Sequence, residues 1–427
     1  MNTQNTFECI EQRFIKTLNL SVASYVHKET GAEHLHFETD NVENVFLVAL
    51  RTMPMNSTGV AHVLEHTALC GSKRYPVRDP FFLMIRRSLN TFMNAFTGSD
   101  CTYYPFASQN RKDFFNLLDV YLDSVFFSRL DPLDFAQEGH RLELKRPGEL
   151  RSELIIKGIV YNEMKGDMSA PISQLYAKLH HYLYPTTTYH YNSGGDPKEI
   201  PSLKYEDLKA FYQSHYHPSN AIFMTYGDIP VSDLQTRFQN NVLRFFKKRD
   251  DQISVEPEMR YSQPIKATEY YPELSCKEHT HVVLAWLFGE SRDLMMVMRC
   301  NLLSEVLLGT SASPLRKALE DSQLGIALSP LSGLEDSSFE MSFVCGLEGC
   351  TDKQEAAIEE LVINTLRKIS KEGVPKEHLE SVLHQYELAQ REISGEGIPY
   401  GLQVMSWCLS AAVHRGAPLS AIDLDPA

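Results

Sequence analysis

Residues 59–82, GVAHVLEHTALCGSKRYPVRDPFF, place three ionisable side chains inside an otherwise apolar segment. These are His62, Glu65 and His66. The apolar residues around them recur with helical spacing, and positions i, i+3 and i+4 share one face of a helix. The sequence therefore predicts a helix that presents two imidazoles and a carboxylate side by side. Ser57 and Thr58, just before it, are N-cap candidates.

This triplet has the spacing of a metal site. Two neutral imidazoles four residues apart can bind one Zn²⁺ at about 2.0–2.1 Å. Glu65 can then lie beside the fourth coordination position and take a proton from a water molecule there, which is the inverted H-x-x-E-H form of the HExxH arrangement. The alternative is that three polar side chains lie on a partly exposed face without function. The complete triplet on an apolar helix makes this alternative the weaker one.

A catalytic zinc needs a third protein ligand and an open position. Residues 153–168, ELIIKGIVYNEMKGDM, form a helix candidate, and an apolar stripe that begins at Ile156 continues to Glu163. A carboxylate on a buried face is costly unless a cation or a donor meets it, so Glu163 is the candidate ligand. From the residues alone, Glu153 competes with it, and a solvated helix end remains an alternative for Glu163.

The element pattern predicts an α+β fold. Alternating segments within residues 20–50 and a hairpin that turns at 98–100 indicate strands, with helical segments between and after them. Residues 248–266 are polar and contain proline, so we expect a linker there. The linker divides the chain into a catalytic unit over 1–247 and a second unit over 267–427.

The second unit repeats the order of the first with different residues. Asn301, Ser304 and Glu305 fall where the metal-type triplet of the first unit stands. This pattern predicts two homologous units, each a mainly antiparallel sheet covered by helices, of which the second is degenerate and non-catalytic.

Charge and hydropathy exclude several partners. The net charge of −14 argues against nucleic acid, because binding phosphates needs basic patches. No stretch approaches the roughly 18 apolar residues of a membrane span. The N-terminus lacks the features of a secretory signal or an organelle presequence, so we expect a cytoplasmic location rather than an organellar matrix.

Several segments resemble one known family. STGVAHVLEHTALCGSKRYPVRDPFF, SLNTFMNAFTGSDCTYYPFAS, GIVYNEMKGDMS and YNSGGDPKEIPSL are similar to the N-terminal half of presequence-protease-type enzymes of the pitrilysin and insulin-degrading-enzyme superfamily. The resemblance implies a pitrilysin-like metallohydrolase fold with one Zn²⁺ per chain, held by His62, His66 and Glu163. It also implies that Glu65 is the general base. Many relatives carry a supporting glutamate where this chain has Ile156.

The NAFT segment carries the expectation about substrate. Asn94, Ala95 and Phe96 would pair with an extended peptide that adds as a strand, and in similar enzymes this strand holds the substrate beside the zinc. Leu69, one turn after His66, is a candidate for lining a side-chain pocket. Without the resemblance, an ordinary hairpin explains the segment equally well.

The resulting prediction is a zinc endopeptidase that hydrolyses unfolded peptides, such as targeting presequences, inside a closed chamber. The family's enzymes have a further C-terminal half, so we expect this chain to be a truncated form whose missing half completes it, and to be weakly active or inactive alone. The alternatives are a non-catalytic scaffold subunit with the same fold and a thioether-cleaving lyase. Such scaffolds have generally lost the triplet, and the lyase is shorter and uses a cysteine ligand.

Overall fold

The computed structural model describes residues 6–149, 151–272, 279–351, 353–391 and 397–423. The chain divides into two compact units. The first unit comprises Met1–Ser169, Thr187–Glu256 and Ser394–Ala427, and the second comprises Ala170–Thr186 and Pro257–Ile393. Both combine helices with largely antiparallel sheets, so the α+β class expected from the sequence is confirmed.

The first unit is built on an eight-stranded sheet in the order β1-β2-β3-β10-β4-β7-β5, with β6 also paired to β7. All pairings are antiparallel except that of β3 with β10. A separate hairpin is formed by β8 and β9. The strands are β1 (Phe7–Ile15), β2 (Leu20–His27), β3 (Glu33–Glu38), β4 (Asn44–Arg51), β5 (Asn90–Met93), β6 (Phe96–Thr97), β7 (Cys101–Ser108), β8 (Arg141–Leu144), β9 (Leu154–Lys157) and β10 (Ala221–Gly227).

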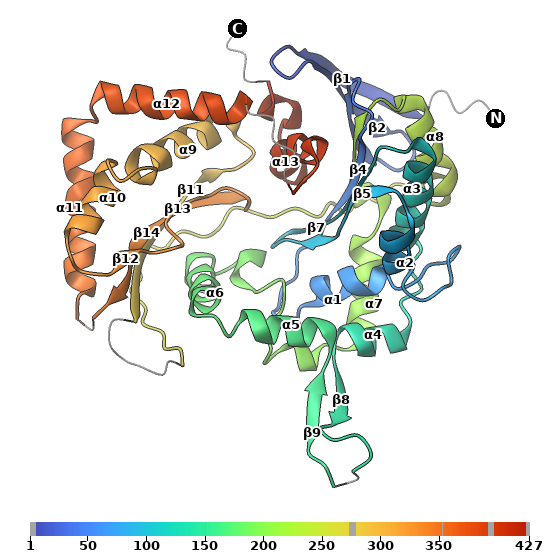
Figure 1. Ribbon diagram of the computed structural model, residues 1–427, viewed down its shortest axis with the longest axis horizontal. Coiled ribbons are helices and arrows are strands. Elements are labelled where there is room, and N and C mark those ends of the chain that lie inside the picture. Colours follow the sequence, from blue (N-terminus) through green and yellow to red (C-terminus); the bar gives the residue numbers. More distant parts are fainter. Residues whose placement is uncertain (1–5, 150, 273–278, 352, 392–396, 424–427) are drawn as a thin grey trace. The chain divides into compact units, whose positions relative to one another are not determined.

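The helices of the first unit lie on both faces of this sheet. They are α1 (Val60–Ala68), α2 (Pro80–Arg87), α3 (Arg111–Phe126), α4 (Pro132–Glu138), α5 (Ile159–Asp167), α7 (Tyr205–His215), α8 (Val231–Asn241) and α13 (Tyr400–Val413). Short 3-10 helices span Thr188–His190, Ile200–Ser202, Pro218–Asn220, Leu243–Phe245 and Pro418–Ala421. Figure 1 shows α13 on one side of the sheet and α3 and α8 on the other.

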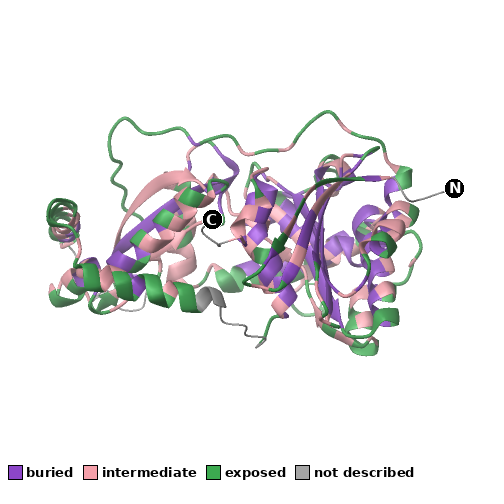
Figure 2. Cartoon of the chain, turned by 90° about the horizontal axis from the view of Figure 1, so that it is seen from above, coloured by how far each residue is buried: buried purple, intermediate pink, exposed green. Residues whose placement is uncertain are grey.

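Strand β4 shows why both faces need a cover. All eight of its residues are buried, and the central strands of the sheet are purple in Figure 2. Because successive side chains of a strand point to opposite faces, Phe46 and Val48 join the cluster packed on α1 and α3, whereas Leu47 and Ala49 join the cluster that contains α13. A continuous apolar run of this kind is typical of a strand buried on both sides.

Helix α13 is where the observed division differs from the expected one. The sequence assigns residues 267–427 to a second unit, but Leu402, Val404 and Met405 pack against the first unit's sheet. The physical reason is the second apolar face of that sheet, which needs a partner that residues 1–247 do not supply.

The second unit contains a four-stranded antiparallel sheet in the order β11-β14-β12, with β13 also paired to β14. Its helices enclose a core around Leu315, Phe343 and Ile358. Its elements are α6 (Pro171–Leu183), β11 (Thr280–Glu290), α9 (Leu294–Leu308), α10 (Pro314–Asp321), β12 (Ala327–Leu328), β13 (Gly333–Glu335), β14 (Glu340–Cys350), α11 (Glu355–Glu372) and α12 (Lys376–Arg391).

The expected linker 248–266 is partly anchored. Glu258 is buried and accepts hydrogen bonds from the backbone and side chain of Thr186. Arg260 forms a bidentate ion pair with Glu340 at the start of β14. The linker residues from Pro257 onward therefore belong to the second unit, which continues to Ile393. Among the described residues, no helix combines the length and apolar character needed to cross a bilayer.

Candidate metal centre

Helix α1 presents His62 and His66 on one face, with ring centroids 5.0 Å apart. The helix is almost wholly buried in the core, and His66 alone among its nine residues is half-exposed. The N-cap prediction for Ser57 and Thr58 was wrong, because the helix begins after Gly59, whose φ of 70° lies in the left-handed region, and no side chain caps it. The i, i+4 spacing places the two imidazoles side by side on one face of the helix, as predicted from the sequence.

Glu163 approaches this pair from α5. One of its carboxylate oxygens lies 3.8 Å from Nε2 of His62 and 3.9 Å from Nε2 of His66. The candidate ligand atoms of these three residues all lie within 4.8 Å of one another. Ligands held tetrahedrally at about 2.0–2.1 Å are about 3.3 Å apart, so a small inward movement would complete the set.

The hydrogen bonds of the two imidazoles fit a metal. Nδ1 of His62 lies 3.1 Å from the carbonyl oxygen of Gly194, and Nδ1 of His66 lies 3.1 Å from a carboxylate oxygen of Glu138. Both partners are acceptors, so each Nδ1 carries the proton and each Nε2 of a neutral ring keeps its lone pair. Two nitrogen lone pairs then face the Glu163 carboxylate, an arrangement that is unfavourable unless a cation lies between them.

Glycines bring Gly194 to His62. A Cβ atom on Gly59 would lie 2.8 Å from the carbonyl oxygen of Gly194, and one on Gly195 would lie 3.0 Å from the Cα of Gly59. The loop around 192–196 can therefore reach the start of α1 only because both segments have glycine, without a side chain, at the contact. This close approach directs the Gly194 carbonyl at the imidazole.

Another glycine contact fixes the start of α5. A Cβ on Gly158 would lie 1.8 Å from the carbonyl oxygen of Gly139, the residue that follows Glu138. The end of α4 and the start of α5 thus meet backbone to backbone. The partner of His66 and the third candidate ligand are positioned by the same junction.

Glu163 was predicted as a ligand from an apolar helical stripe that begins at Ile156, and that argument was wrong. The position of Glu163 nevertheless suits a ligand. Residues 153–168 are not one helix: Ile156 lies in β9, opposite Leu142, and the side chain of Glu163 is 54% exposed. Glu153 lies in the exposed hairpin region, where it pairs with Lys145. The structure does not bring Glu153 to the histidines.

Glu65 lies within the protein, with 8% of its surface exposed. The hydroxyl of Thr97, in β6, donates a hydrogen bond of 2.7 Å to its Oε2 atom. A buried carboxylate beside two histidines is suited to accept a proton from a water molecule at the mouth of the site.

The charges around His66 act on its pKa. Burial works to lower it, but the hydrogen bond that His66 donates to Glu138 and the charges of Glu65, Glu138 and Glu163 together raise the pKa above its usual value. Three carboxylates thus surround a pair of imidazoles and create a negative potential that favours a bound cation.

The expected substrate strand lies at the edge of the large sheet. Strands β5 and β6 pair with β7 alone among the described strands, and α1 contacts β6. Asn94 is exposed, while Ala95 and Phe96 are half-buried, and the Phe96 ring stacks on Tyr103 at 5.0 Å. Leu69 is only 8% exposed and packs in the core, so little of its surface can contact a ligand.

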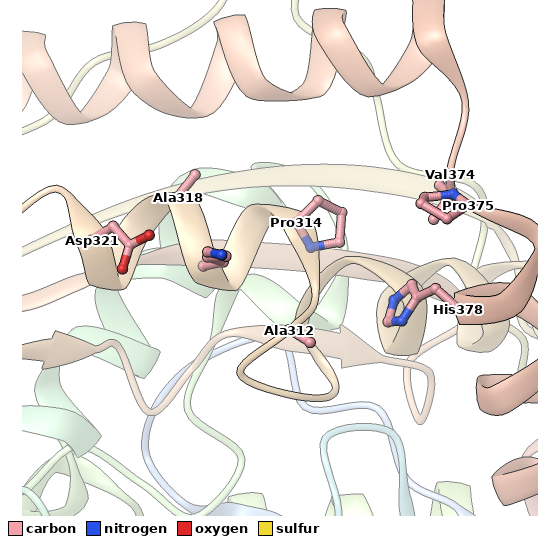
Figure 3. A pocket seen from close by; sticks show the side chains of 8 residues that line it. Ala312, Pro314, Ala318, Asp321, Val374, Pro375 and His378 are labelled. Carbon is pink, nitrogen blue, oxygen red and sulfur yellow. The ribbon is translucent and has the colours of Figure 1, made fainter.

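The described residues of the second unit offer no comparable group. Asn301 donates a hydrogen bond to Asp336, and Ser304 is buried in α9. A hollow of about 470 Å³ lies between α10 and the start of α12, and Figure 3 shows the side chains that line it. There, His378 uses Nε2 to donate to the carbonyl of Val306. Within the described residues, only His62, His66 and Glu163 form a metal-type cluster.

Sequence reasoning missed Glu138, Gly194 and Thr97. The doublet Gly194-Gly195 was a signal of close backbone approach, and Thr97 follows the substrate segment directly. Nothing in the local sequence distinguishes Glu138 from other exposed-looking acids, because its burial depends on α1.

The chain is similar to several known peptidases. The chain matches the family model described as "Insulinase (Peptidase family M16)" over residues 51–157, and one described as "Peptidase M16 inactive domain" over residues 202–386. It is 39% identical to "Presequence protease, mitochondrial" of Xenopus tropicalis, across 99% of this chain and 41% of that protein. The chain thus spans well under half the length of this curated relative.

Solved structures share the fold at low identity. The crystal structure of pitrilysin superposes with a TM-score of 0.67 at 14% identity, covering 99% of this chain and 44% of that one. A structure of a peptidase M16 inactive domain from Pseudomonas fluorescens gives a TM-score of 0.69 at 17% identity, covering 94% and 90% of the two chains.

Proposed function

Because the chain belongs to the insulinase family of peptidases, family M16, we propose that it is the zinc-binding part of an endopeptidase that cleaves extended peptides. The observation that carries the proposal is the convergence of two Nε2 lone pairs and one carboxylate on a single point, with both Nδ1 atoms held by acceptors. This is the donor set that a catalytic zinc takes, with one position open.

His62, His66 and Glu163 would hold the ion. A bound Zn²⁺ lowers the pKa of a water molecule to about 7 and polarises a peptide carbonyl. Glu65 accepts the proton of the attacking water and returns it to the leaving amine. The exposure of Glu163 and His66 leaves the site open to solvent and substrate on one side.

The proposed substrates are unfolded peptides. Only an extended chain can add to the open edge of β5 and β6, where backbone hydrogen bonds bind with little dependence on sequence. The Xenopus relative is named a presequence protease, so targeting presequences are the substrates we propose to test first.

A complementary half completes the proposed enzyme. The chain corresponds to 41% of the Xenopus relative, so groups that stabilise the transition state and close a chamber would come from the rest. A donor of that kind is worth about 10²–10³ in rate. We therefore propose that residues 1–427 alone are weakly active or inactive. The cytoplasmic location stays a prediction, and the relative's name, which includes "mitochondrial", points the other way.

Zinc analysis and peptide hydrolysis test the proposal. The chain should hold one Zn²⁺, lost in His66→Ala. Glu65→Gln should keep the metal and abolish hydrolysis in the presence of the complementary half, because glutamine cannot accept the water's proton. Hydrolysis at an undiminished rate by Glu65→Gln would refute the assignment of the base. A zinc-loaded, completed enzyme that cleaves no peptide would instead favour the scaffold alternative.

A further inference from the structure

Among the residues that the structure describes, Thr97 is the one whose side chain donates a hydrogen bond to the Glu65 carboxylate. Glu65 is nearly buried, so water can supply little of what its two oxygens need. The last side-chain torsion of a glutamate is otherwise broad, and a donor at one oxygen sets the plane of the carboxylate. Oε2 is occupied by Thr97, and Oε1 is left to act on other groups.

Thr97 is itself held on two sides. Its strand β6 pairs with β7, where Thr97 lies opposite Thr102. The turn that follows is fixed through Asp100, whose Oδ2 receives the hydroxyl of Tyr189 at 2.6 Å and Nε2 of His414 at 2.7 Å.

Asp100, in this turn, is buried and accepts hydrogen bonds from several segments. Asp100 is 4% exposed and His414 is 6% exposed. The backbone carbonyl of Asp100 also accepts a hydrogen bond from the amide of Thr52, which follows β4. Segments after β4, before the Gly194 loop and after α13 therefore converge on the turn that carries Thr97.

We infer that Thr97 is a positioning residue for Glu65, and that it ties the general base to the strand on which the peptide is expected to lie. The inference rests on the proposed function for its catalytic meaning. Since Thr97 directly follows Phe96, one two-residue strand sets both the substrate edge and the orientation of the base. A displaced β6 would misalign Glu65 even with the zinc ligands intact.

The kinetic test compares Thr97→Val with Thr97→Ser in the zinc-loaded protein completed by its other half. Valine keeps the shape and removes the hydroxyl, so kcat should fall about 10-fold to 100-fold, the scale of a small misplacement of a reacting group. KM and zinc content should stay unchanged, and serine should restore most of the rate. Thr236→Val is the matched control, because the only partner of its hydroxyl among the described residues is the Ser232 carbonyl in α8.

A second measurement needs no activity. Thr97→Val should lower the melting temperature of the zinc-free chain by roughly 2–4 °C, because it leaves a buried carboxylate without its donor. In a Glu65→Leu background the same substitution should cost nothing. A purely structural role for Thr97 would lower the melting temperature equally in both backgrounds.

The outcomes separate the two proposals. Equal losses in both backgrounds, an unchanged kcat in Thr97→Val, or no rescue by serine would overturn the role of Thr97. A coupled melting effect in a protein that cleaves no peptide would leave the Thr97–Glu65 bond standing and overturn the peptidase function.

Discussion

The last residue of α4 holds the second histidine of α1: a carboxylate oxygen of Glu138 lies 3.1 Å from Nδ1 of His66. Glu138 is 6% exposed, and its other oxygen accepts a hydrogen bond from the side chain of Gln137. The pair fixes the ring orientation and directs Nε2 at Glu163, so a residue far from α1 in sequence decides whether the helix can bind a metal.

Glu138→Ala should therefore weaken zinc binding without removing a ligand. Loss of a partner of this kind costs about 10-fold to 100-fold in metal affinity. Competition with a chromophoric chelator measures the effect. Glu153→Ala is the control and should leave affinity unchanged, because within the described part of the chain that carboxylate pairs with exposed Lys145, away from the histidines. Equal affinities for the wild-type and Glu138→Ala proteins would contradict the role of Glu138.

Gly158→Ala should damage the site through the backbone. The added Cβ would meet the Gly139 carbonyl oxygen at 1.8 Å, so α5 must move and carry Glu163 away from the histidines. Zinc affinity should fall by more than 10-fold, roughly the effect of losing part of one ligand's interaction. Gly166→Ala in the same helix meets nothing within 4 Å and serves as control. If both variants bind zinc equally well, the junction does not position Glu163.

Phe96→Ala should weaken peptide cleavage more than folding. The ring stacks on Tyr103 at the open edge of the sheet, so its loss loosens the strand that is expected to receive the peptide. We expect KM for a peptide to rise several-fold with a small change in melting temperature. Phe82→Ala, on the exposed face of α2, provides a comparison. A large loss of stability with unchanged kinetics would indicate that Phe96 serves packing alone.

The large sheet should be acid-sensitive. His34 and His36 both hydrogen-bond to the Thr225 hydroxyl and are buried. Burial lowers the pKa of His36 from 6.5 to about 4, and burial followed by the charge of His36 lowers that of His34. The folded state thus binds fewer protons than the unfolded chain, so its stability is full above pH 6.5 and falls as the pH drops toward 4.

The expected loss from His36 is about 3 kcal/mol once the pH is well below its folded value. Denaturant unfolding of the zinc-free chain across this range measures it and excludes effects of metal release. His36→Gln should flatten the profile, whereas a parallel profile would show that this histidine does not carry the pH dependence.

The H-x-x-E-H triplet could be read from the sequence, because a helix is a local structure. The spacing of His62, Glu65 and His66 sets their common face whatever else the chain does. Strand β4 and the hairpin that turns at 98–100 could also be predicted from the sequence, since alternation and turn residues act over a few positions.

Only the tertiary structure decided what completes the site. Glu163 lies on a helix that begins after Gly158 and does not include Ile156, because a backbone contact between Gly158 and Gly139 sets the path of the chain. Glu138 and Thr97 meet the triplet through packing between elements, which no local pattern records.

The place of α13 has the same cause. Its apolar residues predict burial but not the surface against which they are buried. That surface is the second face of the first unit's sheet, which Met405 and its neighbours cover. Local periodicity determined which residues face inward, and long-range burial of apolar area determined what they face.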